Sequence, residues 1–212
     1  MCESCWYGIP LIGDQHCVRC GVPSNGQPDG CVHCDPAAWS FRYTRVLAPF
    51  NETARQVIHA LKYHRKRSLG PRLGGLLAAA LRDDVRFGRV DLVLPVPLHR
   101  ARLKQRGYNQ SDLLARALAE ALGKPVPADV LVRTRNTSDQ TKLSAQERRA
   151  NVAGAFSVRH PEKVAGKHLA VVDDVLTTGA TLDACSQALL DAGAQSVFAV
   201  AVASPFQSTS PS

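Results

Sequence analysis

Long apolar runs are missing from this 212-residue chain. The longest nearly apolar stretch, residues 73–81, is far shorter than the ~20 residues that a membrane-spanning helix needs. The N-terminus begins Met-Cys-Glu-Ser-Cys and has neither the basic region nor the apolar core of a secretory signal peptide. The sequence therefore predicts a soluble, cytoplasmic protein without a membrane span.

Aromatic residues are also scarce, at 6% of the chain, and few of them alternate with basic residues. This composition argues against a protein that binds single-stranded DNA by stacking bases on aromatic rings. No internal repeat is present, and a content of 45% hydrophobic and 21% charged residues excludes disorder as the main state. The length suits one ordinary domain and a smaller module.

Positive charge is concentrated in the middle of the chain. The net charge is +8, and residues 98–150 hold eleven basic against five acidic residues. The first 41 residues instead have four acidic residues and one arginine. A basic stretch attracts nucleic acid, phosphorylated small molecules or anionic lipid, and it also occurs as an ordinary solvated surface.

Six of the seven cysteines form three CxxC pairs in the first 34 residues. The pairs are Cys2/Cys5, Cys17/Cys20 and Cys31/Cys34. Two such pairs complete a tetrahedral zinc site, whereas disulfides are not expected without a secretory signal. We therefore predict a zinc-ribbon module over residues 1–40, a larger domain over residues 41–204 and a flexible tail over residues 205–212.

Three pairs supply six thiolates, although one zinc takes four and two zincs take eight. The adjacent pairs, Cys17/Cys20 and Cys31/Cys34, are predicted to form one structural site. Cys2/Cys5 is then left over for a possible second site, which suggests that its partner pair lies upstream of a wrongly assigned start. His16 is a weaker alternative ligand, and Cys185 is predicted to fill the core.

Strand-like and helix-like segments alternate from Ser40 onward. The predicted strands cover residues 42–47, 92–96, 169–172 and 197–202. The predicted helices cover residues 52–64, which Asn51 would cap, 69–83, 111–122 and 179–192. This alternation predicts an α/β domain with a mostly parallel sheet flanked by helices.

The most informative segment is residues 171–181, where a buried strand runs into Asp173 and Asp174 and then into a hydroxyl-rich loop. Ligands of open α/β sheets bind at the carboxyl ends of strands, and a helix N-terminus favours a phosphate. Two carboxylates suit the hydroxyls of a sugar diol. The segment therefore predicts a site for a ribose 5-phosphate. It lacks the Gly-Lys-Ser/Thr ending of a P-loop.

This segment resembles the signature of the type I phosphoribosyltransferases, which bind phosphoribosyl pyrophosphate (PRPP). The resemblance implies that Asp173 and Asp174 hold the ribose hydroxyls and carry the catalytic role. It also implies that the loop binds the 5-phosphate and that Mg²⁺ accompanies the diphosphate. The implied loop residues are Leu176, Thr177, Thr178, Gly179, Ala180 and Thr181.

Other motifs narrow the resemblance to the ComF/GntX family, which is linked with DNA uptake in natural competence. They are Pro95-Val96-Pro97-Leu98, Arg102, Arg106-Gly107-Tyr108-Asn109-Gln110, Arg133-Thr134-Arg135, Thr137, Gln140, Leu143-Ser144, Arg148, Asn151 and Ala155-Phe156. With the cysteine-rich front, the resemblance covers essentially the whole chain. Some relatives carry four CxxC pairs where this chain has three, which leaves the number of zincs open.

Transfer of a phosphoribosyl group needs cations at the departing pyrophosphate. Arg102 and Arg106 follow the strand end where relatives place their pyrophosphate loop. Arg133 and Arg148 flank a polar segment, residues 134–146, that we expect to act as a lid. Lys62 and Tyr63 match a recurrent Leu-Lys-aromatic segment and are candidates for an acceptor pocket, or simply a helix end.

Three functions remain open from the sequence. The first is a phosphoribosyltransferase with an unassigned acceptor, and the second is a PRPP sensor without turnover. The third is an accessory protein that handles single-stranded DNA, alone or with competence-machinery proteins. The acids and threonines serve the first two equally well.

Overall fold

The fold is centred on a parallel sheet whose strands come from distant parts of the chain. The computed structural model describes residues 6, 8–23, 31, 39–137 and 144–205. The strands are β1 (Tyr43–Pro49), β2 (Leu92–Pro95), β3 (Leu131–Arg133), β4 (Phe156–Val158), β5 (His168–Val175) and β6 (Ser196–Ser204). The helices are α2 (Glu52–Tyr63), α3 (Leu69–Leu81), α4 (Val85–Gly88), α5 (Arg100–Arg106), α6 (Gln110–Ala121), α7 (Ala145–Val152) and α8 (Ala180–Asp191), with a 3₁₀ turn at Pro161–Lys163.

The main sheet has the order β1-β6-β5-β2, and all three pairings are parallel. Every residue of β6 is buried, as are the six central residues of β5. The sequences of these strands are continuous runs of apolar or small residues, because a parallel sheet is covered on both faces. The carboxyl ends of all four strands therefore meet at one edge, where a ligand site is expected.

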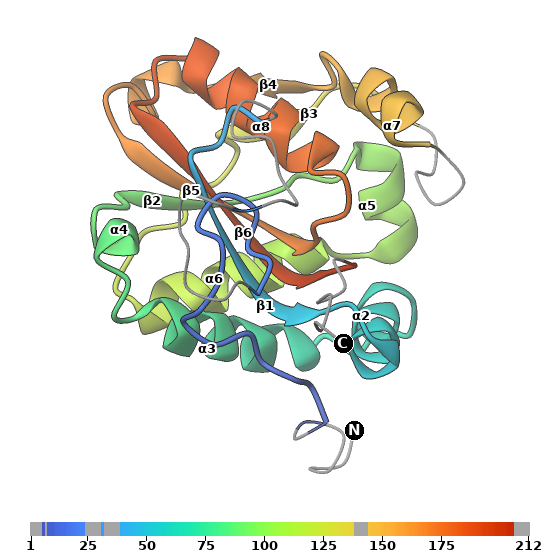
Figure 1. The fold of residues 1–212 in the computed structure, drawn as a ribbon. Helices are drawn as coiled ribbons and strands as arrows, with labels where there is room; N and C mark the ends of the chain where they lie inside the picture. Colours follow the sequence, from blue (N-terminus) through green and yellow to red (C-terminus); the bar gives the residue numbers. More distant parts are fainter. Residues whose placement is uncertain (1–5, 7, 24–30, 32–38, 138–143, 206–212) are drawn as a thin grey trace.

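Helices cover both faces of this sheet (Figure 1). Figure 1 shows α3 and α6 on one face, and α8 with the β3–β4 pair on the other. Two clusters of buried apolar side chains correspond to these layers, one around Leu73, Leu77 and Leu114, the other around Val171, Leu182 and Leu189. Residues 131–133 and 156–158 pair antiparallel as a separate small sheet.

The contact between α3 and α6 depends on glycine. A Cβ at Gly74 would lie 2.6 Å from the Ala117 Cβ and 2.8 Å from the Leu114 carbonyl oxygen. Gly70 is equally close to Leu113. The missing side chains let the two helix backbones approach closely, which brings α6 and its N-terminal Ser111 against the sheet.

The eight elements predicted from periodicity are all present, with bounds that shift by at most three residues. Asn51 caps α2 as predicted, since its side chain accepts a hydrogen bond from the Ala54 N–H at 2.9 Å. β5 is longer than predicted and includes Asp173 and Asp174. Cys185 is fully buried in α8, which confirms its prediction as a core residue.

Several helices and strands were not predicted from the sequence. They are the short helices α4, α5 and α7 and the strands β3 and β4. α5 and α7 are rich in arginine and have little apolar periodicity, so no pattern indicated them. The end of the expected lid segment belongs to α7, which Ser144 and Glu147 begin with a capping box. Residues 138–143, including Lys142, lie outside the described residues.

The segment between Cys17 and Cys20 is hydrogen-bonded to β1. The Thr44 N–H donates to the Val18 carbonyl at 2.8 Å, and the Thr44 hydroxyl donates to the Arg19 carbonyl at 2.7 Å. The division of the chain at residue 40 stays a prediction, as does the C-terminal tail, most of which is not described. In the described part of the chain, no helix is both long and apolar enough to cross a membrane.

Candidate functional site

A cavity of about 350 Å³ opens at the carboxyl edge of the sheet. The end of β5, the loop before α8, the end of α2 and the arginines of α5 contribute to it. Its walls include Lys62, Tyr63, Leu98, Arg102, Arg106, Gln110, Arg133, Arg148, Asp173, Asp174, Leu176, Thr177, Gly179, Ala180 and Thr181. Of the residues predicted to bind PRPP, only Thr178 is not among the lining residues.

The acid pair occupies the floor of this cavity. The Asp173 carboxylate accepts hydrogen bonds from the Ser111 hydroxyl at 3.0 Å and from the Asp174 N–H at 2.9 Å. Burial raises the pKa of Asp173 to about 7, and the adjacent negative charge of Asp174 acts in the same direction. One carboxyl of the pair therefore titrates near neutral pH.

Lys62 compensates the charge of the acid pair. Its Nζ lies 2.6 Å from Asp174 Oδ2, and only 4% of the Asp174 side chain is exposed. Burial by itself would lower the pKa of Lys62, but the Asp174 carboxylate outweighs it and the net pKa is raised. A charged lysine at the end of α2 is thus paired with the carboxylates that a sugar diol would use.

The loop between β5 and α8 has the backbone geometry of an anion site. Gly179 has φ of +79°, in the left-handed region that favours glycine, and it leads directly into the first turn of α8. Thr177, Gly179, Ala180 and Thr181 face the cavity at this helix N-terminus. N–H groups and the helix dipole favour a phosphate at such a position.

Four arginines bring positive charge to the cavity: Arg102, Arg106, Arg133 and Arg148. Arg106 donates to the Gln110 side-chain oxygen and lies over the Tyr63 ring, 5.4 Å from its centroid. Arg133 donates to the Thr137 hydroxyl, while its buried Nε has no hydrogen-bond partner among the described residues. A buried N–H without a partner is costly, and an anionic ligand oxygen would satisfy it.

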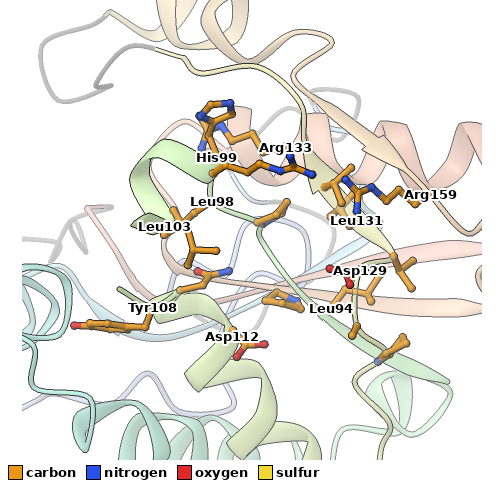
Figure 2. A pocket seen from close by; sticks show the side chains of 18 of the residues that line it. Leu94, Leu98, His99, Leu103, Tyr108, Asp112, Asp129, Leu131, Arg133 and Arg159 are labelled. Atoms are coloured by element: carbon orange, nitrogen blue, oxygen red, sulfur yellow. The ribbon is translucent and has the colours of Figure 1, made fainter. Parts of the chain in front are cut away.

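A second cavity, of about 830 Å³, adjoins the first beyond the loop that follows β2. Leu98 and Arg133 line both cavities and so form part of the wall between them. Figure 2 shows His99, Arg133 and Arg159 toward one side of this second cavity and Asp112 toward the other, with the leucines and Asp129 between them.

Three cysteines near the start of the chain form a separate cluster. The sulfur atoms of Cys17, Cys20 and Cys31 all lie within 4.8 Å of one another, and those of Cys20 and Cys31 are 3.6 Å apart. Tetrahedral zinc with Zn–S bonds of about 2.3 Å holds its sulfurs about 3.8 Å apart. The three thiols therefore fit a metal ion.

The pKa values of Cys17 and Cys20 shift in opposite directions. Burial acts to raise the pKa of Cys17, but the N–H groups of Cys20 and Arg19 outweigh it, so the net pKa is lowered. Burial raises the pKa of Cys20, whose thiolate would need a nearby cation. His16 is not in the cluster, because its ring contacts Arg45 and the Gly13 carbonyl instead. Cys2, Cys5 and Cys34 lie outside the described residues.

Sequence reasoning missed the partners that hold the site together. Ser111 contacts the acid pair, Gln110 contacts Arg106, and Trp39 contacts the loop before α8 (residues 176–179, called the phosphate loop below for its proposed ligand). Gln110 belongs to the motif Arg106-Gly107-Tyr108-Asn109-Gln110, whereas Ser111 and Trp39 are remote in sequence from the groups they contact. Lys62 had been noted, but its ion pair with Asp174 had no sequence signal.

The family comparison agrees with this geometry. The profile "Phosphoribosyl transferase domain" matches residues 109–212, which include α6, the acid pair and the loop before α8. The fold, the cavity and this match together define a protein with a type I phosphoribosyltransferase domain.

Relatives that align over most of the chain identify the family more narrowly than the domain match does. "DNA utilization protein YhgH" of Escherichia coli O157:H7 is 35% identical over 186 residues, covering 85% of this chain and 80% of the relative. "Competence protein F" of Haemophilus influenzae is 30% identical over 201 residues, covering 93% and 87%. "Competence protein ComFC" of Bacillus subtilis is 26% identical, covering 91% and 79%. The chain belongs to the ComF family.

Proposed function

We propose that this protein binds PRPP together with Mg²⁺ in the 350 Å³ cavity. The observation that supports the proposal is the convergence of three groups on one cavity: the acid pair, the loop before α8 and four arginines. In this assignment the loop takes the 5-phosphate, Asp173 and Asp174 accept the ribose hydroxyls, and the arginines face the pyrophosphate. The buried Arg133 Nε then gains the acceptor that it lacks.

The same arrangement supports phosphoribosyl transfer. In that reaction the bond between ribose C1 and pyrophosphate breaks, so the pyrophosphate gains negative charge while the sugar gains positive charge. Arg102 and Arg106 would stabilise the departing pyrophosphate, and the acid pair would sit beside the electron-poor ribose. Mg²⁺, when bound, neutralises diphosphate oxygens. The acceptor of the phosphoribosyl group is not assigned.

Calorimetric titration with PRPP and Mg²⁺ tests the proposal. The parent protein should bind, and Asp174→Asn should lower the affinity at least tenfold, because it replaces one carboxylate acceptor by an NH₂ donor and removes the negative charge that pairs with Lys62. Asp112→Asn is a matched control, since Asp112 lies on α6 outside this cavity and pairs with Arg116. No binding by the folded parent protein would refute the assignment. Pyrophosphate release with candidate acceptors then separates an enzyme from a sensor.

We further propose that the cysteine cluster binds structural zinc, with Cys34 as the fourth ligand of Cys17, Cys20 and Cys31. Three sulfurs at metal-binding separations, of which those of Cys17 and Cys20 are buried, support this, and free thiols suit a reducing cytoplasm, where we place the protein. Elemental analysis should find about one zinc per chain. Cys20→Ser should lose it, whereas Cys185→Ser, which changes a buried core cysteine, should keep it.

A role in DNA handling is a second function with support from the structure. A basic surface continues from the end of α2 to α5, where the Arg67 Nη2 donates to the Gly107 carbonyl at 3.0 Å. Tyr63 lies on this surface with 57% of its area exposed, so a base could stack on it. The exposed members of this α2–α5 basic surface are His59, Tyr63, His64, Arg65, Lys66, Arg67, Arg100 and Lys104. The relatives' names, which mention DNA utilization and competence, agree with such a role.

Fluorescence anisotropy with a labelled oligo-dT strand tests this second function. Lys66→Glu should weaken binding about three- to tenfold at low salt and reduce its salt dependence, as expected for a phosphate contact. Lys163→Glu is the control, because Lys163 precedes the amino end of β5, at the opposite edge of the sheet. Equal effects of the two changes would indicate non-specific charge attraction only.

A further inference from the structure

The cysteine cluster and the phosphate loop are joined by one side chain. Trp39 packs against the apolar group formed by Cys17, Cys20 and Val22. Its Nε1 donates a hydrogen bond to the Thr178 carbonyl at 3.0 Å. The indole thus contacts the thiol cluster on one side and the loop before α8 on the other.

The contact with the loop is close as well as polar. A Cβ on Gly179 would lie 2.3 Å from the Trp39 Nε1 and 2.8 Å from its Cε2. Gly179 therefore needs to be glycine for two reasons, its left-handed φ and the indole that lies against its Cα. The loop is held between Trp39 outside and the cavity inside, because Gly179 also lines the cavity.

Neighbouring hydrogen bonds fix the position of Trp39. Arg19, between Cys17 and Cys20, donates to the carbonyls of Trp39 and Phe41. The Trp39 ring also stacks on Phe41, with centroids 5.2 Å apart. On the other side, the Ser40 N–H donates to the Asp183 carboxylate of α8 at 2.6 Å.

We propose that Trp39 is a positioning residue that relays the state of the cysteine cluster to the phosphate loop. With the cluster holding its metal, Arg19 and Trp39 keep the loop and the first turn of α8 in the geometry that suits a phosphate. Loss of the metal frees the loop and lowers the affinity for PRPP, and by linkage bound PRPP strengthens metal retention. This relay builds on the proposed PRPP site, but its structural part can be measured without PRPP.

Hydrogen–deuterium exchange of residues 176–183 in the full-length protein is the direct measurement. Trp39→Phe keeps an aromatic ring and removes the Nε1 donor, so exchange in this segment should rise about three- to tenfold, as for the loss of one hydrogen bond. Trp6→Phe is the matched control. Trp6 is buried against Ile9 and the main core, its ring lies under Arg72, and its replacement should leave the segment unchanged.

A zinc chelator supplies the second arm. Chelation should raise exchange of residues 176–183 in the parent protein and in Trp6→Phe, but add little in Trp39→Phe, because both perturbations break the same connection. The relay is overturned if Trp39→Phe exchanges like the parent, if chelation leaves the parent unchanged, or if chelation acts equally in parent and Trp39→Phe.

PRPP titration of the same proteins separates the two hypotheses. The expected result is three- to tenfold weaker binding in Trp39→Phe and unchanged binding in Trp6→Phe. If the parent does not bind PRPP, the proposed function fails, while the exchange data still decide whether Trp39 positions the loop. If the parent binds and Trp39→Phe binds equally well, the relay fails and the proposed function stands.

Discussion

Replacement of Lys62 by methionine should destabilise the protein in a strongly pH-dependent way. Lys62 Nζ lies 2.6 Å from Asp174 Oδ2, and the lysine side chain is 24% exposed. At about 4 Å between charge centres and an effective dielectric of ~20, such a pair is worth about 4 kcal/mol. Removing one partner of a buried pair typically costs about 3–5 kcal/mol, and the partial exposure of Lys62 places the expected loss near the lower limit.

Protonation of Asp173 at low pH reduces the free-energy cost of removing Lys62. Asp173 already has a pKa of about 7, and because the charge of Lys62 acts to lower it, loss of Lys62 raises the pKa of Asp173 further. A carboxyl whose pKa is higher in the folded state stabilises the fold below the unfolded pKa of about 4, and this contribution is lost as pH rises. The difference in free energy of unfolding between parent and Lys62→Met should thus be under about 1 kcal/mol at pH 5 and about 2–4 kcal/mol at pH 8.

Urea denaturation at pH 5 and pH 8 measures both values. Lys104→Met is the matched control, because Lys104 is exposed on α5 and forms no ion pair with an acidic side chain among the described residues. Its effect should be below about 0.5 kcal/mol at both pH values. A loss for Lys62→Met that is the same at pH 5 and pH 8 would refute the coupling between the lysine and the acid pair.

Three further changes test other parts of the structure. Asp173→Asn keeps a side-chain oxygen for Ser111 and removes the titrating group, so by denaturation it should be more stable than the parent by about 2–4 kcal/mol at pH 8 and no more stable at pH 4. Gly74→Ala should cost about 1–3 kcal/mol by overpacking α3 against α6, whereas Gly75→Ala, with open space around its Cα, should stabilise by up to about 1 kcal/mol. The same sign for both would contradict the close helix contact. Gly179→Ala should abolish PRPP binding in calorimetry while circular dichroism stays native, and retained affinity would show that the loop tolerates displacement.

The sheet and its flanking helices could be read from the sequence because each has a local periodic signal. β5 and β6 are continuous apolar runs, and α2 has both an apolar stripe and an Asn51 cap. The signature from Asp173 to Thr181 likewise indicated a ribose-phosphate site through residue types alone. These inferences depend on a few adjacent residues and need no knowledge of the tertiary structure.

What the sequence did not reveal depends on distant pairs. Lys62 and Asp174 are 112 positions apart, and Trp39 and Thr178 are 139 apart. Neither pair has a spacing rule, since their proximity follows from the packing of α2 and of Trp39 against the end of β5 and the loop after it. α5 was missed for a different reason, because a short helix with no buried residues has no apolar stripe to recognise.

The pairing of β1 with β6 also dictates the order in which the protein is assembled during synthesis. β1 ends at Pro49, but its neighbour in the sheet is β6, whose last residue is Ser204. A ribosome therefore releases the cysteine-rich segment and β1 long before the strand that supports them exists. Until β6 is made, the edge of β1 that pairs with it stays unpaired. Chains truncated before Ser196 would leave this edge exposed, and such chains would be targets for chaperones or proteases.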